Sequence, residues 1–135
     1  MKKMFLSVLM AAASLLWVTV PLVAHHGAAT FETGKEITLQ GTVTEWLWAN
    51  PHCFLSFDAK DDTGTVRNWV AETQNPTAIS QRGWARRTFK VGDQVTVVLN
   101  PVKDGQPVGR VLHVVLANGQ KLIASFQPGA AGQAQ

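Results

Sequence analysis

The sequence predicts an all-β domain: a small closed barrel of five strands, with one short helix before the fourth strand. Short segments of alternating apolar and polar residues recur between residues 36 and 123. Gly-containing turn sequences separate most of them. One glycine followed by a shift of the alternation indicates a bulged, bent first strand. A β-sandwich is the alternative, but the chain offers too few strands for it.

The first strand is expected in EITLQGTVTEW, residues 36–46. Its apolar residues share one face until Glu45, after which Trp46 and Trp48 take the other parity. Because side chains of a strand alternate between two faces, this shift requires an irregularity, and Gly41 in mid-strand favours a sharp bend. Trp46 and Trp48 themselves should point to the same side.

The later elements follow in order. HCFLSFDAK alternates again, and DDTG (61–64) is a turn leading to a strand in TVRNWVAET. A short helix is predicted over residues 76–82, with Asn75 as its cap, Pro76 in its first turn and Gly83 just past its end.

VGDQVTVVL predicts the fourth strand, and VGRVLHVVLANGQKL the fifth, with its own turn at Asn118–Gly119. The segment KDGQ (103–106) forms the turn between them. Five strands, a bent first strand and a helix before the fourth are typical of an OB-like Greek-key barrel.

The chain divides into four predicted parts. Residues 1–24 have a basic start, a long apolar run and a small residue at Ala24, as in a cleaved signal peptide; a transmembrane anchor is the alternative. An N-terminal arm (25–35), the barrel domain (36–126) and a disordered Gly/Ala/Gln-rich tail (127–135) follow. The predicted location is therefore periplasmic or secreted, without stable membrane insertion after cleavage.

The near-balance of basic and acidic residues argues against nucleic acid as a partner. The chain has 12 Lys and Arg against 9 Asp and Glu, and the loss of Lys2 and Lys3 with the leader leaves 10 against 9. Nucleic-acid binding depends on many cationic contacts with phosphates, which this balance does not provide. We therefore expect a small ligand or another periplasmic protein as the partner.

Four segments carry the most distinctive features of the chain: HHG after the leader, ITLQGTVTEWLWANPHCFLSF, NPTAISQRGWARRTFKVGDQVTV and ANGQKL. Together they resemble the bacterial domain-of-unknown-function family 6152, over nearly all of residues 25–122. The resemblance implies a small exported protein without an assigned biochemical role. Cys53 departs from the apolar or aromatic residue expected after NPH, which is consistent with packing in the core.

The candidate ligand site centres on the NPH tripeptide, residues 50–52. Proline fixes its own φ and disfavours helix before it, so NPH forms a rigid corner between the first two strands. Trp46 and Trp48 could form an aromatic wall beside His52, or could simply cap the barrel end while His52 bonds the loop. The predicted binding residues are Trp46, Trp48, Asn50, His52, Trp84 and Arg86. Arg82 or Arg86 could instead pair with Glu72 or Asp93.

Metal binding is a second hypothesis. Cleavage after Ala24 would leave His25 as the first residue, whose amine and imidazole can chelate Cu(II). The predicted metal ligands are His25, His26 and His52, with copper as the possible cofactor. Two histidines at an exposed terminus can equally be solvated polar residues. Zinc is disfavoured because a structural zinc site needs four ligands at fixed spacing.

Catalysis is not favoured, because the chain shows no nucleophile elbow, paired carboxylates or phosphate-binding loop. No catalytic residue is predicted, and a copper-dependent redox enzyme is the one enzymatic possibility. His113 lies in VLHVVL, where a partly buried histidine without a chemical role is expected. The favoured function is an exported periplasmic binding module that takes a small ligand, metal ion or partner at the NPH corner. The alternative is a copper-binding or copper-handling protein.

Overall fold

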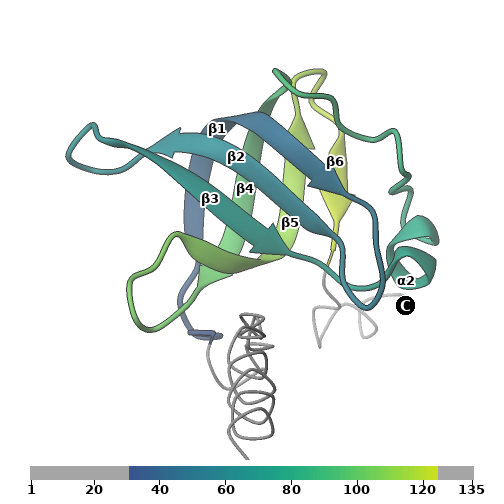
Figure 1. Cartoon of the computed structure of the whole chain (residues 1–135), viewed down its shortest axis with the longest axis horizontal. Coiled ribbons are helices and arrows are strands. Elements are labelled where there is room, and N and C mark those ends of the chain that lie inside the picture. The colour runs from purple at the N-terminus through teal and green to yellow at the C-terminus, as the bar shows by residue number, and fades with distance from the viewer. Residues whose placement is uncertain (1–30, 125–135) are drawn as a thin grey trace, which may run out of the picture.

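A computed structural model describes residues 31–124 of the chain, drawn in colour in Figure 1. The predicted signal peptide (1–24), His25, His26 and the predicted tail (127–135) lie outside the described residues. Within the described region, no helix has the length and apolar character needed to cross a membrane.

The described region is a closed β-barrel. Its elements are β1 (Ile37–Leu47), β2 (Phe54–Lys60), β3 (Val66–Glu72), α2 (Pro76–Ser80), β4 (Gln94–Pro101), β5 (Val108–Leu116) and β6 (Lys121–Ile123). The sheet order is β3-β2-β1-β4-β5-β6, and an additional parallel pairing of β3 with β5 closes the ring. The predicted five-stranded OB-like barrel is confirmed.

The predicted fifth strand is in fact two strands, because its turn at Asn118–Gly119 is a hairpin. Gly119 adopts φ 83°, a left-handed conformation that suits glycine. The three residues after the turn form β6, which pairs antiparallel with β5. β6 therefore extends the sheet beyond the five strands that close the barrel.

The predicted bulge and bend of the first strand are confirmed. β1 pairs with β2 through its second half and with β4 through its first half, so one strand serves both sides of the barrel. The β1–β2 register shifts between Val43 and Glu45, which leaves Thr44 as the extra residue. Figure 1 shows β1 turning sharply as it passes from the back of the barrel to the front.

The helix forms for the predicted local reasons but is two residues shorter. The Asn75 side chain accepts a hydrogen bond from the Ala78 backbone N–H at 2.9 Å, and Pro76 occupies the first turn. The helix ends at Ser80 rather than at residue 82, because residues 81–83 form a tight turn that finishes at Gly83 with φ 87°.

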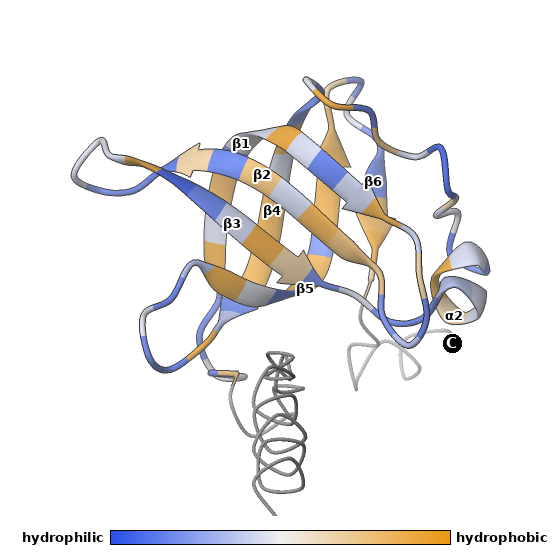
Figure 2. Ribbon diagram, in the orientation of Figure 1, coloured by the Kyte–Doolittle hydropathy of each residue, from blue (hydrophilic) through white to orange (hydrophobic). Residues whose placement is uncertain are grey.

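The core lies inside the barrel, where alternate residues of the strands meet. Figure 2 shows apolar and polar residues alternating along the strands. The largest fully buried side chains include Trp84, Phe57, Leu55 and Ile79. Cys53 is also fully buried and is a free thiol, as its alternation with Leu55 predicts.

The chain before β1 is attached to the barrel from residue 31 onward. Phe31 is 2% exposed and forms an antiparallel bridge with Val102. The Glu32 N–H donates a hydrogen bond to the carbonyl of Pro101 at 2.8 Å. The last residues of the predicted arm (25–35) are therefore part of the folded domain.

Candidate functional site

The NPH tripeptide forms the predicted corner between β1 and β2. The Asn50–Pro51 peptide bond is cis, and Asn50 is exposed. β1 ends at Leu47 and β2 begins at Phe54, so the corner occupies the whole connection. His52 leaves this corner toward the end of β3.

The His52 ring is fixed through one of its two nitrogen atoms. Nδ1 lies 2.9 Å from the carbonyl oxygen of Thr73 and 3.5 Å from Oε1 of Glu72. Both neighbours are hydrogen-bond acceptors, so Nδ1 carries the proton in the neutral ring, and Nε2 keeps its lone pair. Metal-binding histidines have the same arrangement, in which a carbonyl or carboxylate fixes the tautomer and the other nitrogen is the ligand. The side chain of His52 is 36% exposed.

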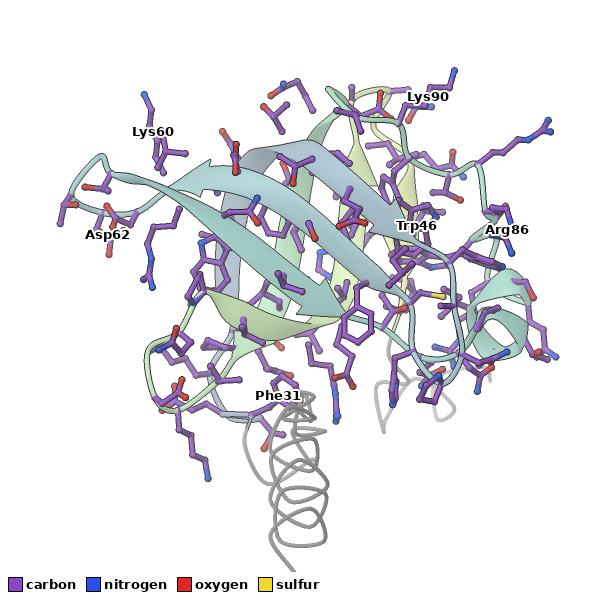
Figure 3. The ribbon with its side chains drawn as sticks, in the orientation of Figure 1. Phe31, Trp46, Lys60, Asp62, Arg86 and Lys90 are labelled. Atoms are coloured by element: carbon purple, nitrogen blue, oxygen red, sulfur yellow. The ribbon has the colours of Figure 1, made fainter. Side chains whose placement is uncertain are left out.

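Glu72 links His52 to Arg110. The Glu72 side chain is 13% exposed, and its Oε1 lies 3.5 Å from Nη2 of Arg110. The parallel β3–β5 register places Glu72 directly opposite Arg110, so barrel closure brings the two charges together. The Arg110 guanidinium in turn lies 4.5 Å from the ring centroid of Phe31, a cation–π contact. Figure 3 labels Phe31 at the lower side of the barrel.

A small cavity of about 240 Å³ adjoins these residues. It is lined by His52, Glu72, Thr73, Gln74, Arg110, Val111 and Ala124. Drug-sized ligands occupy pockets of about 300–1,000 Å³, so this cavity suits a molecule of few atoms or a hydrated ion. Its lining combines one carboxylate, one guanidinium and one imidazole.

The predicted tryptophans gather elsewhere, in an aromatic cluster with Phe89. The ring centroid of Trp46 lies 5.8 Å from that of Trp48, 5.8 Å from that of Trp84 and 5.1 Å from that of Phe89. Trp46 Nε1 donates a hydrogen bond to the Ala85 carbonyl at 3.1 Å. Trp84 is 2% exposed, so the cluster packs against the core at its end of the barrel.

The predicted site residues therefore fall into two groups. Trp46, Trp48 and Trp84 come together, and Arg86 is exposed at the same end of the barrel (Figure 3). His52 belongs to the other group: among the described residues its ring contact is with Phe54, at 6.5 Å between centroids.

Sequence patterns did not identify Glu72 and Arg110 as site residues. The sequence indicated Glu72 only as a possible partner of Arg82 or Arg86. In the structure, the cation beside Glu72 is Arg110. Arg82 donates a hydrogen bond to the Ala124 carbonyl. Asp93 accepts a hydrogen bond from the Lys90 backbone N–H at 2.9 Å.

Of the predicted metal ligands, His52 alone lies in the described region. Residues 31–124 contain no group of three or more His, Cys, Asp or Glu side chains placed to hold a metal ion. Cys53 follows His52 in the chain, but burial raises the pKa of its thiol and so disfavours the thiolate that binds metals. His113 is partly buried on β5, where desolvation lowers its pKa.

A family model described as a family of unknown function, DUF6152, matches residues 12–111. No curated protein and no solved structure matches. Since the family model covers well over half of the chain, the protein belongs to the DUF6152 family.

Proposed function

We propose that the protein is an exported periplasmic binding module whose ligand site is the His52 corner. The basic start, apolar run and Ala24 junction of residues 1–24 support export. The observation that carries the binding site is the position of His52 Nδ1 beside two acceptors, the Thr73 carbonyl and the Glu72 carboxylate, which assigns the proton of the neutral ring to Nδ1. This leaves Nε2 as the nitrogen that accepts a hydrogen bond or binds a metal. The adjoining cavity gives room for a small ligand.

The experiment is native and denaturing mass spectrometry of the protein purified from a periplasmic extract. A mature chain beginning at residue 24 or 25 is expected, together with a bound species that denaturation releases. His52→Ala should lose that species, whereas His113→Ala, a matched change of a partly buried histidine on β5, should retain it. Retention of the species by His52→Ala would place the site elsewhere. An uncleaved chain in the membrane fraction would overturn the export proposal.

Copper handling is the second candidate, and the position of Phe31 favours it. Phe31 is anchored against Arg110, which pairs with Glu72, the carboxylate beside His52. His26 precedes Phe31 by five residues, which reach about 17 Å when fully extended. This reach allows His25 and His26 to approach the nitrogen that His52 leaves unprotonated. The His25 amine, its imidazole and His52 Nε2 are together a nitrogen set suited to Cu(II).

Copper titration of the mature protein tests this candidate. His52→Ala, and a form that lacks His25 and His26, should both bind Cu(II) more weakly than the parent. Glu72→Gln should weaken binding by roughly 10- to 100-fold, because outer partners of a ligating histidine typically have that effect. His113→Ala is the control and should bind as the parent does. Equal copper affinity of the parent and His52→Ala would refute the joint site and leave His52 with a structural role.

A further inference from the structure

A second and larger hollow lies where β1 and β2 separate. The pairing of the two strands ends at Gly41 and Ala59. β1 nevertheless begins earlier, at Ile37, and β2 runs on to Lys60 and into the β2–β3 hairpin, which projects beyond the barrel in Figure 1. The hollow has a volume of about 920 Å³ and is lined by the first half of β1, the end of β2 and the turn that follows, with parts of β4 and β5. Two of its walls are therefore the edges of diverging strands.

The β1 edge presents backbone groups without partners. The Val43 N–H donates to the Asp93 carbonyl, and the Val43 carbonyl accepts from the Gly92 N–H, so the backbone groups of Val43 point toward β4. Alternate residues of a strand direct these groups to opposite sides, so those of Thr38 and Gln40 point toward the side of β2. In the described part of the chain neither residue has a backbone partner on that side. β1 thus offers the N–H and C=O groups of two residues at an open edge.

The facing edge of β2 is open in the same way. The Asp61 N–H donates to the Thr65 carbonyl at 2.9 Å, so the odd-numbered residues of this segment direct their backbone groups toward β3. Lys60 therefore directs its backbone groups toward β1, and no residue of β1 pairs with it. Open strand edges are templates for pairing with another chain, and an extended peptide binds by adding a strand to such an edge.

The inner wall of the hollow is apolar. Leu39 and Ala59 both line it, and by the alternation of the strands they lie on the side that carries buried Val43 and Phe57. Trp69, which also lines the hollow, lies opposite Phe57 in the β2–β3 register and shares this side. Residues of an added strand that face the interior would therefore meet apolar side chains, which favours apolar residues at those positions.

The outer side of the hollow is acidic. Asp58 on β2 lines it, as do Asp61 and Asp62 in the turn that follows. Among the described residues of the lining, Lys60 is the one basic side chain, so three negative charges stand against one positive charge. Figure 3 places Lys60 and Asp62 on the projecting hairpin. The hydrogen bond from the Thr63 hydroxyl lowers the pKa of the Asp61 carboxyl, which is therefore ionised at neutral pH. Cationic side chains are complementary to this surface.

We propose that the hollow receives an extended segment of a partner protein in which apolar and basic residues alternate, paired antiparallel with the β1 edge at Thr38 and Gln40. One strand reaches both surfaces because its successive side chains point to opposite faces of the sheet. Its apolar residues face the inner wall and its basic residues face the aspartates. Thr38 and Gln40 are exposed on the outer face, so the residues that exchange hydrogen bonds with them are the basic ones. This site is separate from the His52 corner and does not depend on its function.

The test is fluorescence anisotropy of the purified protein with the labelled heptapeptide Lys-Val-Arg-Val-Lys-Val-Arg. This peptide should bind roughly tenfold more tightly than Glu-Val-Glu-Val-Glu-Val-Glu, and its affinity should fall as salt is added. Methylation of the backbone nitrogens of its lysines and arginines should weaken binding roughly tenfold, because these N–H groups bond to β1. Methylation of the valine nitrogens is the matched control and should have a much smaller effect, because those N–H groups point away from β1.

Two variants of Gln40 locate the strand edge. Gln40→Pro removes the open N–H but no hydrogen bond to β4, and proline is tolerated where a strand directs its N–H away from its neighbour. It should weaken binding roughly fivefold, as expected for the loss of one hydrogen bond. Gln40→Ala keeps the N–H and should bind as the parent does. His52→Ala should also bind as the parent does, which separates this proposal from the His52 site.

The methylated peptides test the same contact on the unaltered protein, so the outcome does not depend on the folding of Gln40→Pro. Equal binding of the basic and acidic peptides would overturn the proposal, as would equal effects of methylating the basic residues and the valines. Self-association of the protein through this edge in place of peptide binding, measured by sedimentation, would also overturn it.

Discussion

Gly41→Ala should lower the free energy of unfolding by about 2 kcal/mol, because β1 and β2 leave no room for a methyl group at this position. A Cβ added to Gly41 would lie 2.5 Å from the Asp58 carbonyl oxygen and 2.7 Å from Cδ2 of Phe57. The Phe57 ring can shift, but the carbonyl belongs to the backbone of the paired strand. Overpacking typically costs about 1–3 kcal/mol, and a backbone neighbour favours the upper part of that range. The lower entropy of alanine in the unfolded chain offsets about 0.4–1 kcal/mol.

Urea unfolding followed by tryptophan fluorescence measures this loss. With a slope of about 2 kcal/mol per molar urea, the midpoint of Gly41→Ala should fall by about 1 M. Gly34→Ala is the matched control, because an added Cβ there meets nothing within 4 Å and Gly34 has no positive φ. The control should be neutral or slightly stabilising. A Gly41→Ala midpoint equal to that of the parent would refute the close approach of β1 to β2.

Three further predictions concern buried groups. Trp69→Phe should lower the free energy of unfolding in urea by roughly 1–3 kcal/mol less than Trp84→Phe does. The reason is that Trp84 Nε1 donates to the Ile123 carbonyl at 2.8 Å, whereas Trp69 Nε1 has no partner in the described region. Equal losses in the two variants would contradict this. Burial lowers the pKa of His113, so the unfolded state binds more protons below pH of about 6.5, and stability should fall there as the pH decreases. His113→Gln should flatten this pH dependence, and an unaltered profile would assign it to other groups. Cys53 is fully buried with its pKa raised, so a thiol reagent should modify it only after the protein opens; rapid labelling of the folded protein would contradict this burial.

Local patterns were sufficient to predict most of the fold. The shift of alternation in β1 indicated the bulge at Thr44 within two residues, because a bulge reverses which side chains face the core. Asn75, Pro76 and Gly83 specify the start and end of α2 through capping and backbone conformation. These features depend on residues that are close in the sequence, which is why they can be predicted without the tertiary structure.

The Glu72–Arg110 pair could not be predicted in the same way. The two residues are 38 positions apart and meet through the parallel pairing that closes the barrel. Alternation shows which face a residue occupies but not which strand lies beside it or in which register. The placement of Glu72 and Arg110 beside His52 therefore follows from the three-dimensional structure of the closed barrel and not from the sequence pattern.

The segment WLWANPHCF illustrates both outcomes. Its tryptophans follow the bulge of β1 and pack with Trp84 and Phe89, so the prediction that they share a side holds. His52 comes after the corner, where its ring meets Phe54 and the end of β3. The turn of the chain between these residues separates an aromatic cluster that packs against the core from a histidine whose Nδ1 is bound to the end of β3.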